Sequence, residues 1–490
     1  MLGEVVVADR TDNFTVSGAV EYTVRSDESY TFSGVISGDA SASITKSGAG
    51  TLTFSGDNTA TSAIIVNDGT MVFSNYNLFQ NLTINEGTVN LTKTYSGGPV
   101  CIPADCTITV GSSTGTKAAV LNLNALYNLN QQNKTFTIYK NGTVNLTNTQ
   151  NFAWPNGGTS QLLFVGGGTM SGTGIWQQGA LRDTVVRGEN ATATISCTRL
   201  DTYGDMNVTI EEASGVLNVR SYFTNAQSRT LTKTGAGKLV LSSSGTLQKI
   251  AVEQGTLTLQ NNTLAVSEIT LTDGAMLELG TDPGIGGALS VTGSGVGQQG
   301  AVQFSDTATV SSAITLAGDS TFSVAAGKTG TISGNLQGAG KTLTKTGDGT
   351  LTLPGTGDGQ ISLQILEGTL ELTQTSNFSD ITLGKGVLAL DFTSDIMADT
   401  LGLSPDGTLL VNMDGLVAND TLFSSNDGMF SVFTDAANAV KLSHAMQGYF
   451  LEGVRIGNNM VFNVNPAAVP EPATWLLLLL GGLFLGRYRR

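Results

Sequence analysis

Three copies of one short pattern constrain this chain more than any other feature. Each copy is an apolar-alternating run that ends in Thr-Lys, followed by a Gly-containing turn and a second alternating run. The copies occupy residues 44–54, 231–241 and 343–353. A Gly opens another alternating run 23, 22 and 23 residues after Lys46, Lys233 and Lys345. Short strands that return after a constant length of chain predict the stacked coils of a solenoid.

The alternation within each copy predicts strands with one buried face. In an extended strand, Leu52 and Phe54 point to one side while Thr51 and Thr53 point to the other. Gly69 can take a positive φ where the chain turns a corner. Gly accounts for 62 of 490 residues, so the chain is too Gly-rich to be mainly helical. Charged residues account for only 13%, so the chain is too apolar to be disordered. We therefore expect an all-β chain folded as a parallel β-helix, or β-solenoid.

The charge and the scarce metal ligands exclude several functions. The net charge is −15, and no basic run occurs before the last four residues, so a nucleic-acid partner is not expected. One histidine, His444, and three cysteines do not make a zinc site, and we expect no metal and no cofactor. Cys101 and Cys106 either form a small disulfide loop or stay unpaired, and Cys197 has no evident partner.

The chain divides into five segments by pattern. A cap is needed because the last coil of a solenoid would expose strand edges and an apolar cross-section. We expect it to include a short helix near 435–446. No secretory signal precedes Val5, so we expect an upstream start. The segments are first coils at 1–94, an irregular section with loop insertions at 95–230, regular repeats at 231–390, the cap at 391–465, and a linker with an apolar helix and basic tail at 466–490.

Two stretches of the irregular section are expected to project as loops. They are Cys101–Pro103 and Phe152–Gly158, which interrupt the alternation with Pro and Gly. Insertions on a repeat scaffold gather where binding takes place. If the protein holds a glycan, these loops are its first candidate site.

The repeat pattern resembles a known family. The words Leu-Thr-Lys-Thr-Gly-x-Gly-x-Leu-x-Leu, followed one coil later by Glu/Asp-x-Gly-Thr-Leu-x-Leu, are similar to the autotransporter-associated β-strand repeat of bacterial surface proteins. This resemblance implies a right-handed parallel β-helix, an adhesin-like or stalk-like body, and no conserved catalytic residues.

The last residues form a different kind of segment. Pro470-Glu471-Pro472 precedes an apolar run, Ala473–Gly486, and a basic tail. As a helix, these 14 residues would span about 21 Å against a hydrocarbon core of about 30 Å, so they predict a short transmembrane helix. Trp475 and the terminal arginines flank the helix as interfacial anchors do.

The order of these elements resembles the PEP-CTERM sorting signal. The resemblance implies that a membrane-embedded exosortase cuts near Pro470–Pro472 and passes the chain to the cell surface or the extracellular matrix. A plain membrane anchor is the alternative. The residues of the expected signal are Val469, Pro470, Glu471, Pro472, Trp475, Arg487, Arg489 and Arg490.

The sequence contains no complete catalytic motif of the kinds considered below. The Gly-Lys-Thr at 340–342 lacks the Gly that a P-loop requires five residues earlier, where Asn335 stands. No Gly-x-Ser-x-Gly elbow accompanies His444. Repeat-borne acids such as Glu367 and Glu371 are expected to point outward. We therefore expect a non-enzymatic, exported structural or adhesive protein, with extracellular polysaccharide as a possible partner. The alternatives are a carbohydrate-active β-helix enzyme, which needs two carboxylates close together, and a glycan-binding module.

Overall fold

The computed structural model of the protein describes most of the chain between Ala8 and Pro466. The chain forms two compact units, Met1–Ser290 with Ser294–Ala301 and Val291–Gly293 with Val302–Arg490, called unit 1 and unit 2 below. The described residues are 8–38, 41–58, 63–75, 79, 81–92, 107–123, 135–147, 151–153, 161–178, 183–202, 204–224, 228–353, 360–373, 376–391, 396–403, 407–412, 421–425, 432–434, 440–442, 449–456 and 459–466.

Unit 1 is built from three series of strands, each forming one side of a coil. The first series is β2 (Ala19–Thr23), β5 (Ser43–Ser47), β7 (Ala63–Val66), β9 (Asn81–Ile84), β11 (Thr107–Val110), β13 (Thr135–Tyr139), the beginnings of β16 (Gln161–Gln178) and β17 (Asp183–Thr202), β18 (Met206–Ile210), β21 (Thr230–Thr234), the ends of β23 (Ser244–Val252) and β25 (Thr263–Leu271), and the beginning of β27 (Ala288–Gly293). The second is β3 (Ser29–Phe32), β6 (Thr51–Phe54), β8 (Thr70–Phe73), β10 (Gly87–Leu91), β12 (Ala119–Leu123), β14 (Gly142–Leu146), the middles of β16 and β17, β19 (Val216–Val219), β22 (Lys238–Leu241), β24 (Thr256–Leu259) and β26 (Met276–Leu279). The third is β1 (Phe14–Val16), β4 (Ile36–Gly38), β15 (Asn151–Ala153), the ends of β16 and β17, β20 (Tyr222–Thr224) and the beginnings of β23 and β25.

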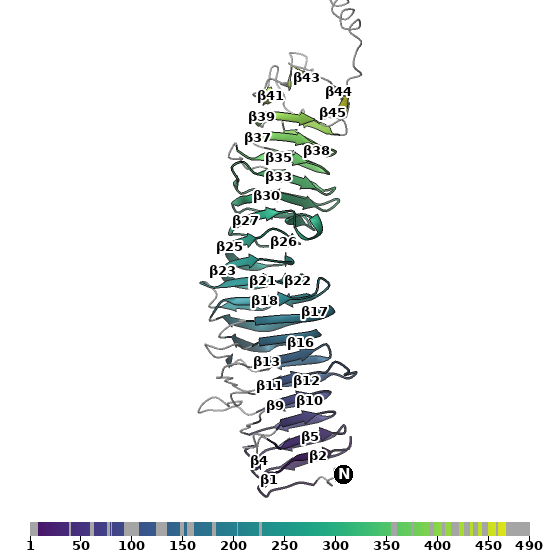
Figure 1. Ribbon diagram of the computed structural model, residues 1–490, viewed down its shortest axis with the longest axis vertical. Coiled ribbons are helices and arrows are strands. Elements are labelled where there is room, and N and C mark those ends of the chain that lie inside the picture. The colour runs from purple at the N-terminus through teal and green to yellow at the C-terminus, as the bar shows by residue number, and fades with distance from the viewer. Residues whose placement is uncertain are drawn as a thin grey trace, which may run out of the picture. The chain divides into compact units, whose positions relative to one another are not determined.

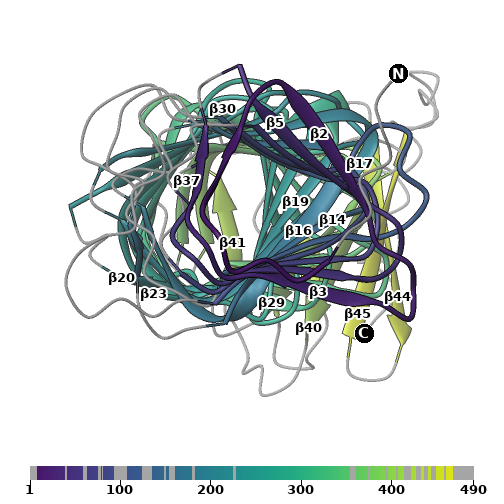
Figure 2. The same ribbon diagram turned by 90° about the horizontal axis from the view of Figure 1, so that it is seen from below.

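The strand pairs within unit 1 confirm the parallel solenoid. Ile44 pairs with Ile64 and Ile64 with Leu82, so the chain returns to the same place after 20 and then 18 residues. The strands of unit 1 lie one above another in Figure 1. Viewed along the stack, β2 and β3 lie on different sides of the coil (Figure 2). Parallel pairing is possible here because each coil supplies the crossover that neighbouring parallel strands need.

The core of unit 1 is a set of apolar columns along the inward faces of the strands. Leu52, Met71 and Val89 follow one another on β6, β8 and β10, and each is fully buried. At the end of the same strands, the ring centroids of Phe32 and Phe54 lie 5.4 Å apart. The Phe54 ring lies 5.3 Å from that of Phe73. Each coil thus packs its large side chains on equivalent side chains of the next.

Unit 2 contains two series of strands of the same kind. The first is β28 (Val302–Phe304), β30 (Ile314–Val324), β33 (Thr342–Thr346), β35 (Ser362–Ile365), β37 (Ser376–Leu383), β39 (Ile396–Leu403) and β41 (Thr421–Ser425), with the short β32 (Leu336–Gln337) beside β30. The second is β29 (Ala308–Val310), β31 (Thr329–Ile332), β34 (Thr350–Leu353), β36 (Thr369–Leu372), β38 (Val387–Asp391) and β40 (Thr408–Asn412).

Antiparallel strands follow the parallel ones at the C-terminal end of unit 2. They are β42 (Val432–Thr434), β43 (Val440–Leu442), β44 (Tyr449–Ile456) and β45 (Asn459–Pro466). β45 pairs with β40 and β44 with β45, which places a hairpin on the edge of the last parallel strand. This is the segment in which we expected a cap. The helix expected near 435–446 is wrong where the chain is described, because Val440–Leu442 pairs with β42 as a strand.

Helix is nearly absent from the described residues, which contain one 3-10 turn, η1 (Val296–Gln298). Among them, no helix has the length and apolar character needed to cross a membrane. The expected transmembrane helix, Ala473–Gly486, lies outside the residues that the structure describes.

Candidate functional site

Three buried lysines are the most unusual chemical feature of the solenoid. Lys46 on β5, Lys233 on β21 and Lys345 on β33 are 0%, 0% and 1% exposed. Each lies two residues after a buried apolar residue, on the inward face of its strand. A charged side chain in such a position is stable only if the protein satisfies its donors. We call each lysine with its carbonyl partners a lysine corner.

The three lysine corners have the same hydrogen bonds. The Lys46 ammonium donates to the carbonyl oxygens of Ser47 at 2.9 Å, Gly48 at 2.5 Å and Asp68 at 3.0 Å. An ammonium has three N–H donors, so the geometry uses all of them. Two acceptors belong to the lysine's own turn and the third to the next coil. The equivalent acceptors are Thr234 at 2.7 Å, Gly235 at 2.7 Å and Gln254 at 3.0 Å for Lys233, and Thr346 at 2.8 Å, Gly347 at 2.7 Å and Glu367 at 3.1 Å for Lys345.

Glycines make this approach of two coils possible. Gly235 and Gly255 have φ values of +73° and +73°, in the left-handed region that favours glycine. A Cβ on Gly255 would lie 2.4 Å from the carbonyl oxygen of Gly235 and 2.5 Å from that of Gly237. The glycines shared by the three copies therefore bring the carbonyl groups of neighbouring coils close enough for one lysine to bind both.

Burial changes the acid–base behaviour of these lysines. Desolvation lowers the pKa of Lys46 to about 8, although the Asp68 carboxylate opposes the shift. Desolvation also lowers the pKa of Lys345 to about 8, opposed by Glu367 and Asp348. The pKa of Lys233 falls to about 7 by burial, and Gln254 stands where the other corners have an acid. These amines are closed to solvent, and each is hydrogen-bonded to backbone carbonyl groups.

Comparison with protein families identifies the segments that contain the corners. The family model of the passenger-associated transport repeat matches residues 44–73, 231–259 and 343–360. The chain carries three passenger-associated transport repeats. This confirms the repeat expected from the sequence. No curated protein matches the chain.

Each transport repeat contains the lysine of one corner. The first match spans the whole corner, from Lys46 to Asp68, and the second spans Lys233 to Gln254. The third includes Lys345 and its turn, while Glu367 lies just beyond the match. The Lys and Gly residues of the repeat pattern are thus residues that form hydrogen bonds between two coils.

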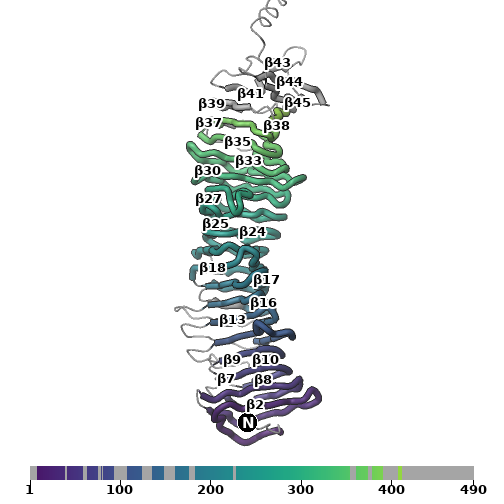
Figure 3. The backbone as a smooth tube through the Cα atoms, turned by 45° about the vertical axis from the view of Figure 1, so that its right-hand side comes forward, coloured from purple at the N-terminus to yellow at the C-terminus, as the bar shows by residue number. Residues whose placement is uncertain are grey.

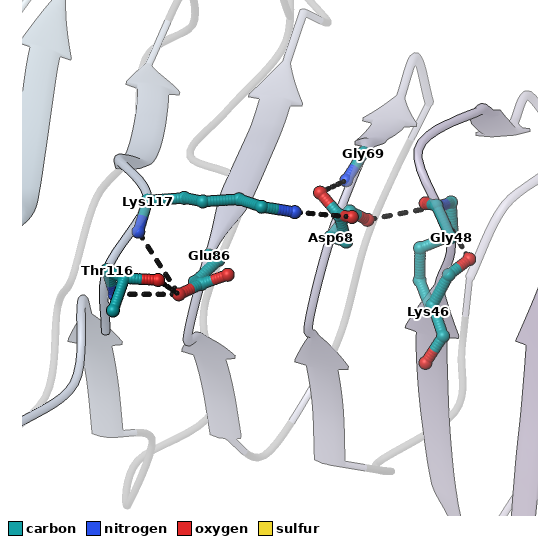
Figure 4. Close-up of polar contacts among 8 residues, drawn as sticks. Lys46, Gly48, Asp68, Gly69, Glu86, Thr116 and Lys117 are labelled. Carbon is teal, nitrogen blue, oxygen red and sulfur yellow. Dashed lines mark hydrogen bonds and ion pairs between the residues drawn. The ribbon is translucent and has the colours of Figure 1, made fainter. Parts of the chain in front are cut away.

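The first transport repeat also borders a cluster of charged side chains (Figure 4). The Lys117 ammonium lies 2.9 Å from the Asp68 carboxylate. The Glu86 carboxylate accepts backbone N–H groups of Thr116 at 2.8 Å and Lys117 at 3.1 Å. Asp68 and Glu86 stand one coil apart, because Thr70 pairs with Thr88. A carbohydrate-active enzyme would need two carboxylates close together, and these two acids are on neighbouring coils.

The charges around this pair do not fit such an enzyme. Hydrogen bonding by Lys117 lowers the pKa of Asp68, and the backbone N–H groups of Thr116 and Lys117 lower that of Glu86. A glycosidase needs one carboxyl with a raised pKa as general acid. Both carboxylates are held ionised by contacts with residues 116–117, so they tie neighbouring coils together.

Other acids named in the sequence analysis also take part in contacts between coils. Glu367 is exposed, as expected, and accepts the backbone N–H of Gly347 at 2.9 Å. Glu371 is half-buried and accepts the hydroxyl of Thr352 at 2.8 Å. Among the described residues, no group of three or more His, Cys, Asp or Glu side chains could hold a metal ion.

Several predicted residues lie outside the described part of the chain. They include His444, both cysteines of the possible disulfide, and most of the two candidate loops; the described residues of Phe152–Gly158 are the last two of β15. Cys197 is buried, and its Sγ lies 3.4 Å from the hydroxyl oxygen of Ser221. The eight residues of the expected sorting signal, Val469, Pro470, Glu471, Pro472, Trp475, Arg487, Arg489 and Arg490, also lie outside.

The lysine corners were missed as sites by sequence reasoning, although a signal was present. The Thr-Lys pair was used only as a marker of the repeat. In the alternation Leu231-Thr232-Lys233, the lysine falls on the same side as the leucine. Alternation alone therefore predicts a buried lysine, and the following Gly predicts carbonyl groups turned toward it.

Proposed function

We propose that this protein is an exported surface protein whose β-solenoid is a structural or adhesive body without catalytic activity. The observation that carries the proposal is the presence of three passenger-associated transport repeats in a parallel solenoid. The corner lysines are engaged in hydrogen bonds within their own turn and to the next coil. Extracellular polysaccharide is the partner class we propose for an adhesive role, to be tested on a glycan array.

We further propose that the C-terminal segment sorts the protein. In this scheme Ala473–Gly486 enters the membrane, and an exosortase-type enzyme cuts near Pro470–Pro472. The support comes from the sequence: Pro-Glu-Pro, a short apolar run and a basic tail follow one another. The chain would then leave the membrane for the cell surface or the extracellular matrix.

Mass spectrometry of the mature C-terminus tests the sorting proposal. We expect the native protein to end near Pro470–Pro472 and the Glu471→Ala variant to keep its C-terminal residues. Pro466→Ala is a matched control, because it changes a proline just outside the motif and should be processed normally. Recovery of the native chain in the cell envelope with Arg490 at its end would favour a plain membrane anchor.

A further inference from the structure

One face of unit 1 carries a regular grid of uncharged side chains. It is formed by the outward residues of β3, β6, β8, β10, β12, β14 and the middles of β16 and β17, and we call it the threonine face. β8, β10, β16 and β17 follow one another along unit 1 in Figure 3. The first column is Ser29, Thr51, Thr70, Thr88, Val120, Thr143, Thr169 and Thr194, and the second is Thr31, Thr53, Val72, Asn90, Asn122, Asn145, Ser171 and Ser196.

The grid is regular in both directions. The strand pairs that carry it run without a bulge from β3 to β14, and the register shifts between β16 and β17 fall on either side of it, at Val165/Gly167 and Gly172/Ile175. Neighbouring coils lie about 4.8 Å apart, and residues two apart along a strand lie about 6.6 Å apart. The side chains of each column therefore recur at a fixed interval along the stack, and the two columns lie at a fixed interval across it.

Hydrogen bonds hold part of the grid rigid. The Asn122 side-chain amide donates to the carbonyl oxygen of the Asn90 side chain at 2.7 Å, and Asn145 donates to Asn122 at 2.9 Å. The Ser171 hydroxyl continues the row by donating to Asn145 at 2.9 Å. Side chains fixed in this way lose little conformational entropy when a partner binds.

The two columns of the threonine face lack the side chains on which most macromolecular partners anchor. Its two columns contain no cation for a phosphate backbone. They contain no Trp, Tyr, Phe or Arg, the side chains that anchor most protein interfaces or stack on sugar rings. The nearby charges of Asp68, Glu86 and Lys117 lie at the corner before β8, β10 and β12 and not in the columns. What remains is an array of hydroxyl, methyl and amide groups.

We propose that the threonine face binds ice. The spacing of its side chains between coils and the spacing along a strand are both close to the spacings of oxygen atoms on the prism plane of hexagonal ice. Six of the eight residues in the first column are threonine. Each threonine offers a hydroxyl that anchors a water molecule and a methyl group that fits between waters. Val120 keeps the same shape in that column. Water held at lattice positions joins a growing crystal, whereas a charged side chain would orient its own hydration shell and break the match.

The test is ice affinity of the purified full-length chain. We expect it to shape growing ice crystals, to inhibit ice recrystallisation and to be enriched in slowly frozen ice. Thr88→Lys with Thr143→Lys should abolish all three effects. Thr109→Lys on β11 is the matched control: it replaces an outward, half-buried threonine on another side of the coil and should leave them unchanged.

Circular dichroism separates loss of the face from loss of the fold, since the lysine variants should keep the strand spectrum of the native chain. The proposal is overturned if the native chain has no effect on ice, or if Thr109→Lys removes the effect as completely as the face variants. Self-association of the native chain through this face, seen by sedimentation without any effect on ice, would also overturn it.

Discussion

The Nζ atom of Lys46 lies 3.0 Å from the carbonyl oxygen of Asp68, which is 22 residues later in the chain. The same bond joins Lys233 to Gln254 and Lys345 to Glu367. In each case one side chain ties a turn to the coil that follows it. Coils in a solenoid contact only their neighbours, so such a bond helps to set the number of residues in that one coil.

Removing a corner lysine should loosen two coils at once. Lys233→Met keeps the length of the side chain but leaves the carbonyl oxygens of Thr234, Gly235 and Gln254 without their donor. We expect a loss of roughly 2–4 kcal/mol, since each unsatisfied buried acceptor costs about 1–3 kcal/mol. The measurements are the urea midpoint and hydrogen exchange of the peptide at 250–259.

Lys238→Met is the control for this prediction. Lys238 is partly exposed and lies 2.7 Å from Glu278 in an ion pair, a kind of contact worth about 0–1 kcal/mol. If both variants change the urea midpoint and the exchange rates equally, the lysine corner has no special role.

The corner lysines should make stability rise with pH. The pKa of Lys233 is about 7 in the folded protein, against an ordinary value of 10.5. Between these values the unfolded chain binds more protons than the folded one, so the free energy of unfolding increases as pH rises. Below this window both states are protonated, and above it both are neutral, so the contribution is constant there. The stability difference between native protein and Lys233→Met should therefore widen from pH 7 towards pH 10.5. A difference that narrows over that range would contradict the burial of this amine.

Substitution of two glycines by Ala distinguishes the cost of backbone strain from the cost of a steric clash between coils. Gly255 and Gly274 have φ values of +73° and +82°, but only Gly255 has backbone atoms where a Cβ would be placed. Gly274→Ala should cost about 1–2 kcal/mol, the penalty for a side chain in the left-handed region. Gly255→Ala should cost clearly more, because the coils must also move apart. Equal thermal shifts for the two variants would show that the coils do not approach as closely as described.

The phenylalanine column should be sensitive to truncation. Phe54 is fully buried between the rings of Phe32 and Phe73. Phe54→Ala should destabilise unit 1 by about 3–5 kcal/mol, the usual cost of removing a buried ring. Phe54→Leu should cost less because it refills part of the cavity. Urea unfolding followed by circular dichroism measures both, and a loss below about 1 kcal/mol for Phe54→Ala would argue against a packed column.

Much of the solenoid was predictable from the sequence because alternation and spacing are local signals. The run at 343–353 forms β33 and β34, and the strand expected after Gly368 is β36. Thr350 pairs with Thr369, as equal coil lengths require. The right-handed sense expected from the family resemblance stays a prediction.

The parts that the sequence did not reveal depend on contacts between coils. In the irregular section, Leu82 pairs with Ile108 and Ile108 with Phe136, which are 26 and 28 residues apart, so a fixed interval could not align them. The helix expected near 435–446 rested on a mixed apolar run, but β42 offers Val440–Leu442 a strand partner. The threonine face was invisible because its columns become regular only once the register is known.

Protease treatment of intact cells tests most directly whether the solenoid is a surface body. The account predicts that peptides from both units are released from living cells, while the Glu471→Ala variant keeps its C-terminal peptide in the membrane fraction. Recovery of the native protein only after the cells are broken, with no solenoid peptide released from intact cells, would contradict it.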